Sequence, residues 1–405
     1  MRTNLQNPSV FKAFFLIALI FVLNPFNTKA QGVWTAKANY PDVSSRSVAF
    51  SIGNKGYIGL GYQDSTNFFW EFDPSLNTWT RISDFPGSAR VRGSAFSIGT
   101  KGYVTTGSNL GGPGFCNDLW EYDQLTDVWT QKADPPFNPR TYATGFAIGN
   151  KGYIGTGDTT DSGSGAVDYV RDFWEYDPAS DSWIQIPDFP GVGKAPAVGF
   201  SIGNKGYFGT GNQEISDMAS SDFWEYDPAS QEWTPKADLP TPKCGATGFS
   251  VLGKGYIGTG VTTSAYTNDF YEYDPGNDLW TRVADLTGPT RKHAVAFTIG
   301  SKGYAGTGNY DDFYEFDPTA VGINELTIVG KIRIAPNPGH GAFTLVSEQE
   351  ESQLIICNVL GETISEIRLN FGNNSLDLSE FAAGLYSCVQ MKGAAIVARE
   401  KLIIQ

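Results

Sequence analysis

Cationic side chains recur at one fixed place along the sequence and are its clearest candidates for ligand chemistry. The first of six Gly-Tyr pairs has Ser44 twelve residues before its Gly, but Arg46 follows two residues later, on the same side of an extended strand. The other five pairs have a Lys or Arg at the position of Ser44: Arg90, Arg140, Lys194, Lys243 and Arg291. If these cations surround one opening, they form a candidate site for an acidic glycan or another carboxylate. In the alternative interpretation each cation is structural and hydrogen-bonds the loops beside it.

Acidic residues near the longest variable loop are candidates for calcium binding. Asp158, Asp161 and Asp168 lie within "DTTDSGSGAVDYVR", and Asp172 follows this segment. Calcium prefers several oxygen ligands, but this spacing matches no EF-hand loop. A polar loop rich in Gly and Ser is also typical of a solvated surface segment. We therefore expect no metal and no cofactor, with calcium as the alternative.

Few residues have the types and spacing of a catalytic site. The chain has two His residues, His293 and His340. It lacks the HExxH motif of zinc proteases. The formal net charge of −14 argues against nucleic acid as a partner, because proteins that bind it present a basic surface. The sequence favours a binding protein over an enzyme.

Internal repeats predict the elements that position these residues. "DFWEYDPASDSW" begins at Asp172, and "DFWEYDPASQEW" begins at Asp222. In five repeats the Trp or Tyr of this segment is followed nine residues later by another Trp. The interval between the Gly that closes the Gly-Tyr strand and this aromatic residue varies, at 9, 13, 17, 13, 11 and 6 residues. Fixed intervals predict short strands and tight turns, and the variable interval predicts surface loops gathered on one face.

The repeats predict an all-β, six-bladed propeller over residues 33–320. A small residue always precedes a repeated Phe, which indicates crowding near a common axis: Ala49, Ala95, Gly145, Gly199, Gly248 and Ala296. The last repeat lacks the outer Trp, whereas Trp34 has no repeat before it. We expect the N-terminal strand to complete the last blade and so to remove two open edges. The repeated Glu and Asp of "FWEYD" are expected to be structural, because identical carboxylates spread around a ring do not converge on one ligand.

Together these features resemble kelch-repeat propellers over residues 33–317. The departure is a Thr-Gly or Leu-Gly pair where that family usually has Gly-Gly. Kelch oxidases related to galactose oxidase require two His residues around copper, and only His293 lies in the predicted propeller. Sialic acid mutarotases are a kelch group that works with Arg and acidic groups and no metal. A metal-independent enzyme of that kind, or a lyase, is the alternative to a non-catalytic module that binds acidic glycans or a surface protein.

The N-terminus has the pattern of a secretory signal peptide, assigned to residues 1–30. Arg2 and Lys12 precede an apolar run over residues 13–23, and "TKA" supplies a cleavage site at residues 28–30. The run is too short for a stable membrane span, and no other stretch approaches 18 apolar residues. We expect an exported protein without a membrane span.

The tail, residues 328–405, has its own pattern of alternating strands with Gly and Pro turns, which predicts a small Ig-like β-sandwich. The tail resembles the C-terminal sorting domain of type IX secretion cargo through Pro336, Asn337, Pro338, Gly341 and Phe343, followed by "NVLGE" and "GLY". This resemblance implies a Bacteroidetes-type protein that crosses the periplasm, is handled by the type IX machinery, and is then released or held at the outer-membrane surface. The alternative is a terminal Ig-like binding domain.

The predicted positions of the four cysteines indicate which of them can form disulfides. Cys116 and Cys244 fall in opposite blades and are expected to be too far apart for a disulfide. Cys357 and Cys388 lie on separate strands of the tail and are candidates for pairing.

Overall fold

The computed structural model describes residues 31–62, 67–112, 114–160, 168–213, 219–321, 330–358, 363–393 and 395–405. Every element of regular secondary structure assigned in these residues is a strand, as the repeats predict. The chain divides into two compact units, residues 1–322 and residues 323–405. Within the described ranges, no helix is long and apolar enough to cross a membrane. The predicted signal peptide lies outside these ranges.

The first unit contains six four-stranded antiparallel sheets within its described residues. Five of them are formed by strands in chain order, from the innermost strand outward. The first sheet contains β2 (Val48–Ile52), β3 (Lys55–Gly59), β4 (Phe69–Asp73) and β5 (Thr78–Arg81), and the second contains β7 (Ser94–Ile98), β8 (Lys101–Thr105), β10 (Leu119–Asp123) and β11 (Val128–Lys132). The third sheet contains β12 (Thr144–Ile148), β13 (Lys151–Gly155), β14 (Phe173–Asp177) and β15 (Ser182–Ile186), and the fourth contains β17 (Val198–Ile202), β18 (Lys205–Gly209), β20 (Phe223–Asp227) and β21 (Glu232–Lys236). The fifth sheet contains β22 (Thr247–Val251), β23 (Lys254–Gly258), β24 (Phe270–Asp274) and β25 (Leu279–Arg282). Two short strand pairs accompany them: β6 (Arg90–Val91) with β9 (Ser108–Asn109), and β16 (Lys194–Ala195) with β19 (Asn212–Gln213).

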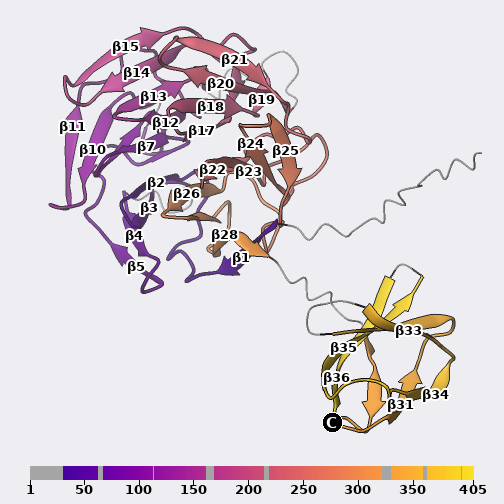
Figure 1. Ribbon diagram of the computed structural model, residues 1–405. Helices are drawn as coiled ribbons and strands as arrows, with labels where there is room; N and C mark the ends of the chain where they lie inside the picture. Colours follow the sequence, from indigo (N-terminus) through magenta and orange to yellow (C-terminus); the bar gives the residue numbers. More distant parts are fainter. Residues whose placement is uncertain are drawn as a thin grey trace, which may run out of the picture. The chain divides into compact units, whose positions relative to one another are not determined.

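The sixth sheet combines the two ends of this unit. Its strands are β26 (Val295–Ile299), β27 (Lys302–Gly306), β28 (Phe313–Val321) and β1 (Gln31–Ala36). Trp34 of β1 pairs with Phe316 of β28, which is the strand pairing expected from the unmatched Trp and the incomplete last repeat. The innermost strands β2, β7, β12, β17, β22 and β26 contact one another in this order, and β26 also contacts β2 (Figure 1). The arrangement is propeller-like.

The recurring glycines have a packing role between neighbouring sheets. A Cβ atom on Gly102 would lie 2.1 Å from the Phe50 ring of the preceding sheet, and one on Gly56 would lie 2.2 Å from the ring of Phe297. The Gly of each Gly-Tyr pair therefore makes room for the Phe of an adjacent innermost strand. The small residues that precede these Phe residues line the space between the innermost strands.

The repeated carboxylates of "FWEYD" are used inside their own sheets. Tyr57 donates a hydrogen bond to Glu71 at 2.7 Å, and Lys55 forms an ion pair with Asp73. The same Tyr–Glu hydrogen bond and Lys–Asp ion pair recur in all six sheets of the described residues. These acids hold adjacent strands together, which agrees with the structural role predicted from their repetition.

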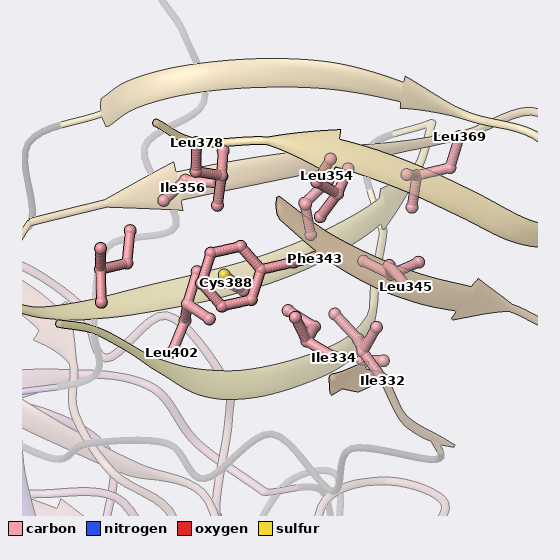
Figure 2. Close-up of a cluster of buried hydrophobic side chains, with 13 residues drawn as sticks. Ile332, Ile334, Phe343, Leu345, Leu354, Ile356, Leu369, Leu378, Cys388 and Leu402 are labelled. Carbon is pink, nitrogen blue, oxygen red and sulfur yellow. The ribbon is translucent and has the colours of Figure 1, made fainter. Parts of the chain in front are cut away.

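The second unit is built from two sheets. The larger contains β29 (Gly330–Lys331), β36 (Ala395–Ile404), β35 (Gly384–Lys392), β32 (Ser352–Cys357) and β33 (Thr363–Leu369), in that order. The smaller contains β30 (Arg333–Ala335), β31 (Ala342–Ser347) and β34 (Gly372–Asp377). Figure 2 shows the core of buried side chains, which includes Phe343, Leu345, Leu354, Cys388 and Leu402.

No disulfide bond is assigned to Cys116, Cys244, Cys357 or Cys388 in the described structure. In the second unit, Cys388 pairs across the sheet with Ile356 and is buried, and burial raises the pKa of its thiol to about 12. Because Cys357 follows Ile356 directly, strand alternation places it on the opposite face of the sheet. This alternation explains why the candidate Cys357–Cys388 disulfide is not formed.

Candidate functional site

The five cations that recur before the Gly-Tyr pairs are buried and paired with Asp residues. Arg140 contacts both carboxylate oxygens of Asp172, at 2.6 and 2.9 Å. The equivalent pairs are Arg90–Asp118, Lys194–Asp222, Lys243–Asp269 and Arg291–Asp312. None of the five cationic residues exposes more than 1% of its surface. They therefore do not present a ring of free charges, and the alternative in which they hold neighbouring loops matches the observed contacts.

The chemistry of these pairs follows from their burial. Burial alone would raise the pKa of Asp172, but hydrogen bonds and positive charge from Arg140 hold it below its usual value. Burial lowers the pKa of Lys194, and Asp222 offsets part of this effect. Each pair is thus a charged contact that depends on both members.

The buried Arg residues also hold a strained turn. Nη1 of Arg140 donates to the carbonyl oxygen of Thr156 at 3.2 Å, and Thr156 has a φ of 57°. Arg90 and Arg291 make the same contact with Thr106 and Thr307. Each of these Thr residues precedes a Gly, and the left-handed backbone of the Thr is a conformation that usually favours Gly.

The sheet formed by β2 to β5 lacks both members of the pair. Ser44 stands in the position of the cation, and Phe68 stands in the position of the Asp. The indole of Trp120 donates to Asp118 at 2.7 Å, whereas the equivalent buried Trp70 Nε1 has no hydrogen-bond partner in the described structure. The joint loss of cation and acid supports the view that each pair is one structural unit.

A second ring of residues lies two positions further along each repeat, and we call it the mouth ring. Its members are Arg46, Arg92, Tyr142, Pro196, Gly245 and His293. All of them except Pro196 have a positive φ, between 55° and 60°. The residue that follows each member lines a central cavity of about 190 Å³. The mouth ring therefore stands at one end of that cavity.

Backbone hydrogen bonds join the members of the mouth ring. The amide of Arg92 donates to the Arg46 carbonyl at 3.0 Å, and the amide of Tyr142 donates to the Arg92 carbonyl at 2.8 Å. The amide of His293 donates to Gly245, and that of Arg46 donates to His293. This chain of contacts fixes the left-handed backbone from which the side chains extend.

Three side chains of the mouth ring gather around the aromatic ring of a fourth member, Tyr142. Nε of Arg46 donates to the Tyr142 hydroxyl at 2.8 Å, and the Arg92 guanidinium lies 5.0 Å from the centre of the Tyr142 ring. His293 stacks on Tyr142 with ring centres 5.5 Å apart. A Cβ atom on Gly245 would lie 3.0 Å from Cε1 of His293, so the missing side chain leaves space for the imidazole.

The electrostatics of this cluster differ from those of the paired cations. Within the described residues, neither Arg46 nor Arg92 has an ion pair, and Nε of Arg92 is buried without a hydrogen-bond partner. Burial, followed by the charges of Arg46, Lys292 and Arg92, lowers the pKa of His293 to about 3. The imidazole is thus neutral at neutral pH, beside two partly buried guanidinium groups. Such an arrangement attracts an anion and disfavours a metal ion.

Of the six predicted ligand-binding residues, only Arg46 belongs to the mouth ring. Sequence reasoning missed Arg92, Tyr142 and His293, although the two-residue step that identified Arg46 identifies them as well.

The three calcium candidates differ in what the structure shows of them. Asp158 accepts hydrogen bonds from Thr160, Asp168 accepts one from Thr159, and Asp161 lies outside the described residues. The described residues contain no group of three or more His, Cys, Asp or Glu that could hold a metal.

The residues of the predicted sorting motif meet the C-terminal strand. Oδ1 of Asn337 accepts a hydrogen bond from the Ile403 amide at 2.9 Å, and its Nδ2 donates to the Lys401 carbonyl. Pro336 and Pro338 flank this residue, Gly341 has a φ of 60°, and Phe343 is part of the core. The motif thus holds the end of β36 in place through the hydrogen bonds of Asn337.

Comparison with known proteins separates the two units. Residues 333–405 match the family model of the secretion system C-terminal sorting domain. Among solved structures, the one titled "Structure of YjhT" aligns with a TM-score of 0.59 at 17% identity, covering 69% of this chain and 95% of that chain. This likeness supports a propeller-like fold and says nothing further about activity. No curated protein matches the sequence.

The sorting domain establishes where the protein acts. Type IX secretion cargo carries this domain, and it indicates export to a secreted state or to the outer-membrane surface. The protein is therefore handled by the type IX secretion system, as the tail predicted.

Proposed function

We propose that the first unit is a six-bladed kelch-type propeller, closed by β1, that binds an acidic glycan at the mouth ring without chemical conversion. The observation that carries this proposal is the contrast in charge pairing on adjacent rings. Five cations are neutralised by Asp residues, whereas Arg46 and Arg92 lie together without acidic partners in the described residues. The sorting domain supports such a role, since an exported protein of the Bacteroidetes type meets glycans outside the cell.

The geometry suits the carboxylate of an acidic glycan. A guanidinium presents parallel N–H donors that match the two oxygens of a carboxylate. The Arg92 Nε atom would gain the partner it lacks, and Arg46 would exchange the Tyr142 hydroxyl for a charged acceptor. Partial burial strengthens both contacts, because water competes less for the charges.

A glycan array with residues 31–405 tests this proposal directly. We expect binding to oligosaccharides that end in N-acetylneuraminic or glucuronic acid, and not to their methyl esters. Arg46→Ala and Arg92→Ala should each weaken the affinity about ten- to hundredfold, since charged hydrogen bonds contribute about 1.5–3 kcal/mol. Arg282→Ala is the matched control, because Arg282 lies on an outer strand with an exposed side chain. Equal binding of esters and acids would contradict the proposal.

The second candidate is a metal-independent sugar-converting enzyme that resembles the sialic acid mutarotases, or a lyase. The stacking of His293 on Tyr142 favours it, because imidazole and phenol groups can transfer protons in general acid–base catalysis. NMR exchange spectroscopy of N-acetylneuraminic acid measures the interconversion of its anomers. The enzyme would be supported if the protein accelerates the interconversion of the anomers and His293→Gln does not. If the interconversion with the unchanged protein is as slow as in buffer, the binding module remains.

A further inference from the structure

A groove of about 550 Å³ lies at the edge of the same loops, apart from the mouth ring. Its walls come from the segment before β12 and from the end of the longest variable loop, including Asn138, Asp168 and Arg171. Trp174 of β14 and Asp188 complete it. Its volume falls within the range of pockets that hold small ligands. None of the mouth-ring residues lines this groove.

The inner wall of the groove is neutral and aromatic. Arg140 and Asp172 contribute to it, but their charges cancel in the buried pair. The indole of Trp174 donates to Asp172 at 2.8 Å, and its ring lies 6.0 Å from that of Phe137. These contacts hold Trp174 in a fixed orientation. A rigid, partly exposed indole offers an apolar surface at low entropic cost.

The rim of the groove offers both hydrogen-bond donors and acceptors. The side chains of Arg171 and Asn138 have no hydrogen-bond or ion-pair partner in the described structure. Asp168 accepts a bond from Thr159 through Oδ2, and Asp188 accepts one from Gln185 through Oδ1, which leaves one oxygen on each carboxylate. All four rim residues are exposed. The two carboxylates outnumber the one free cation, so the rim disfavours an acidic ligand.

We propose that this groove binds a neutral oligosaccharide, with one pyranose ring stacked on Trp174. A pyranose has an apolar face of C–H groups and a rim of hydroxyls, each of which both donates and accepts hydrogen bonds. Trp174 matches the apolar face, Asp168 and Asp188 accept hydroxyl protons, and Asn138 and Arg171 donate to hydroxyl oxygens. Residues 168–171, at the end of the longest variable loop, thereby acquire a function that the composition of the loop did not predict. The mouth ring is not needed for this binding.

Calorimetry with residues 31–405 and neutral hexasaccharides of glucose, mannose, galactose and xylose tests the groove. We expect at least one to bind, and we expect Asn138→Ala/Asp188→Ala to weaken that binding tenfold or more. Asp238→Ala is the matched control, because Asp238 is exposed at the equivalent position of the next repeat. Arg171→Ala serves as an independent variant on the opposite wall and should also weaken binding.

Binding that persists in Arg46→Ala/Arg92→Ala would support a site separate from the mouth ring. Absence of binding to all four sugars would overturn the proposal. Binding that survives both groove variants, or that is lost only in the mouth-ring variant, would also overturn it. Neither result bears on the binding of acidic glycans, so the two proposals fail independently.

Discussion

The positions of the paired cations and of the mouth ring lie only two residues apart in the repeat, yet their roles differ. The paired cations are nearly identical in five sheets, and each is matched by an Asp. Five of the six mouth-ring residues share a left-handed backbone conformation, but their side chains range from Gly to Arg. Repetition therefore marks what builds the fold, and variation on a repeated backbone marks what can recognise a ligand.

This comparison also explains the exceptional first repeat. Ser44 and Phe68 remove the buried pair there, while Arg46 places a cation in the mouth ring instead. A charge that serves stability in five repeats is available for binding in the first.

Removal of one member of a buried pair should have the largest effect on stability. Arg140→Ala leaves Asp172 without its cation and frees the Thr156 carbonyl. We expect a loss of about 3 kcal/mol in the free energy of unfolding, the low end for buried pairs, because Asp172 keeps some contact with water. Urea denaturation measures this loss.

The first repeat supplies the control for that measurement. Arg140→Ser/Asp172→Phe copies its Ser44 and Phe68 and should recover a large part of the lost stability. If Arg140→Ala were as stable as the unchanged protein, the structural role of the paired cations would be wrong.

Acid should weaken the fold through His293 before it affects the carboxylates. The folded state holds the pKa of His293 at about 3, below the ordinary value of 6.5. Between these values the unfolded chain binds the additional proton, so stability falls as the pH falls from about 6.5, by up to about 1.4 kcal/mol per pH unit. Thermal unfolding between pH 7 and pH 4.5 measures this slope.

His293→Gln should flatten that slope, because glutamine does not titrate. His340 lies in the other unit and provides the matched control, His340→Gln, which should leave the slope unchanged. An unaltered slope in His293→Gln would show that the imidazole is not held neutral among the mouth-ring cations.

Gly245→Ala should have a smaller effect on stability and a clear effect on the mouth ring. Gly245 has a φ of 59°, and a Cβ atom there would crowd His293 at 3.0 Å. We expect a loss of about 1–2 kcal/mol from the left-handed backbone. The NMR signals of the His293 ring should shift. Gly276→Ala, at a turn without positive φ, is the control.

The sequence was sufficient to predict most of the fold because its signals are local and periodic. Fixed spacing placed the strands, whereas the close approach of Phe50 to Gly102 is seen only in the folded chain. The Arg–Asp pairs were hidden because the separation between partners varies from 21 to 32 residues. The intervening loop varies in length among the repeats, so no single interval connects the two residues.

The mouth ring was missed for a different physical reason. A search for repeats finds positions at which the same type of residue recurs. The mouth ring has different residue types at equivalent positions, and it is recognised by the backbone conformation that most of its members share. Arg92, Tyr142 and His293 become a site only when the innermost strands are brought together around one cavity. Burial and the absence of acidic partners in the described residues are likewise properties of the folded chain.

The most direct test of the account measures affinity and stability on the same two variants. Arg92→Ala should reduce the affinity for an oligosaccharide ending in a carboxylate sugar about tenfold or more, and should change the free energy of unfolding by less than about 1 kcal/mol. Arg140→Ala should do the reverse, with a large loss of stability and an unchanged affinity in the protein that remains folded. If Arg92→Ala lowered stability and left affinity unchanged, the mouth ring would be part of the scaffold, and the central claim would be contradicted.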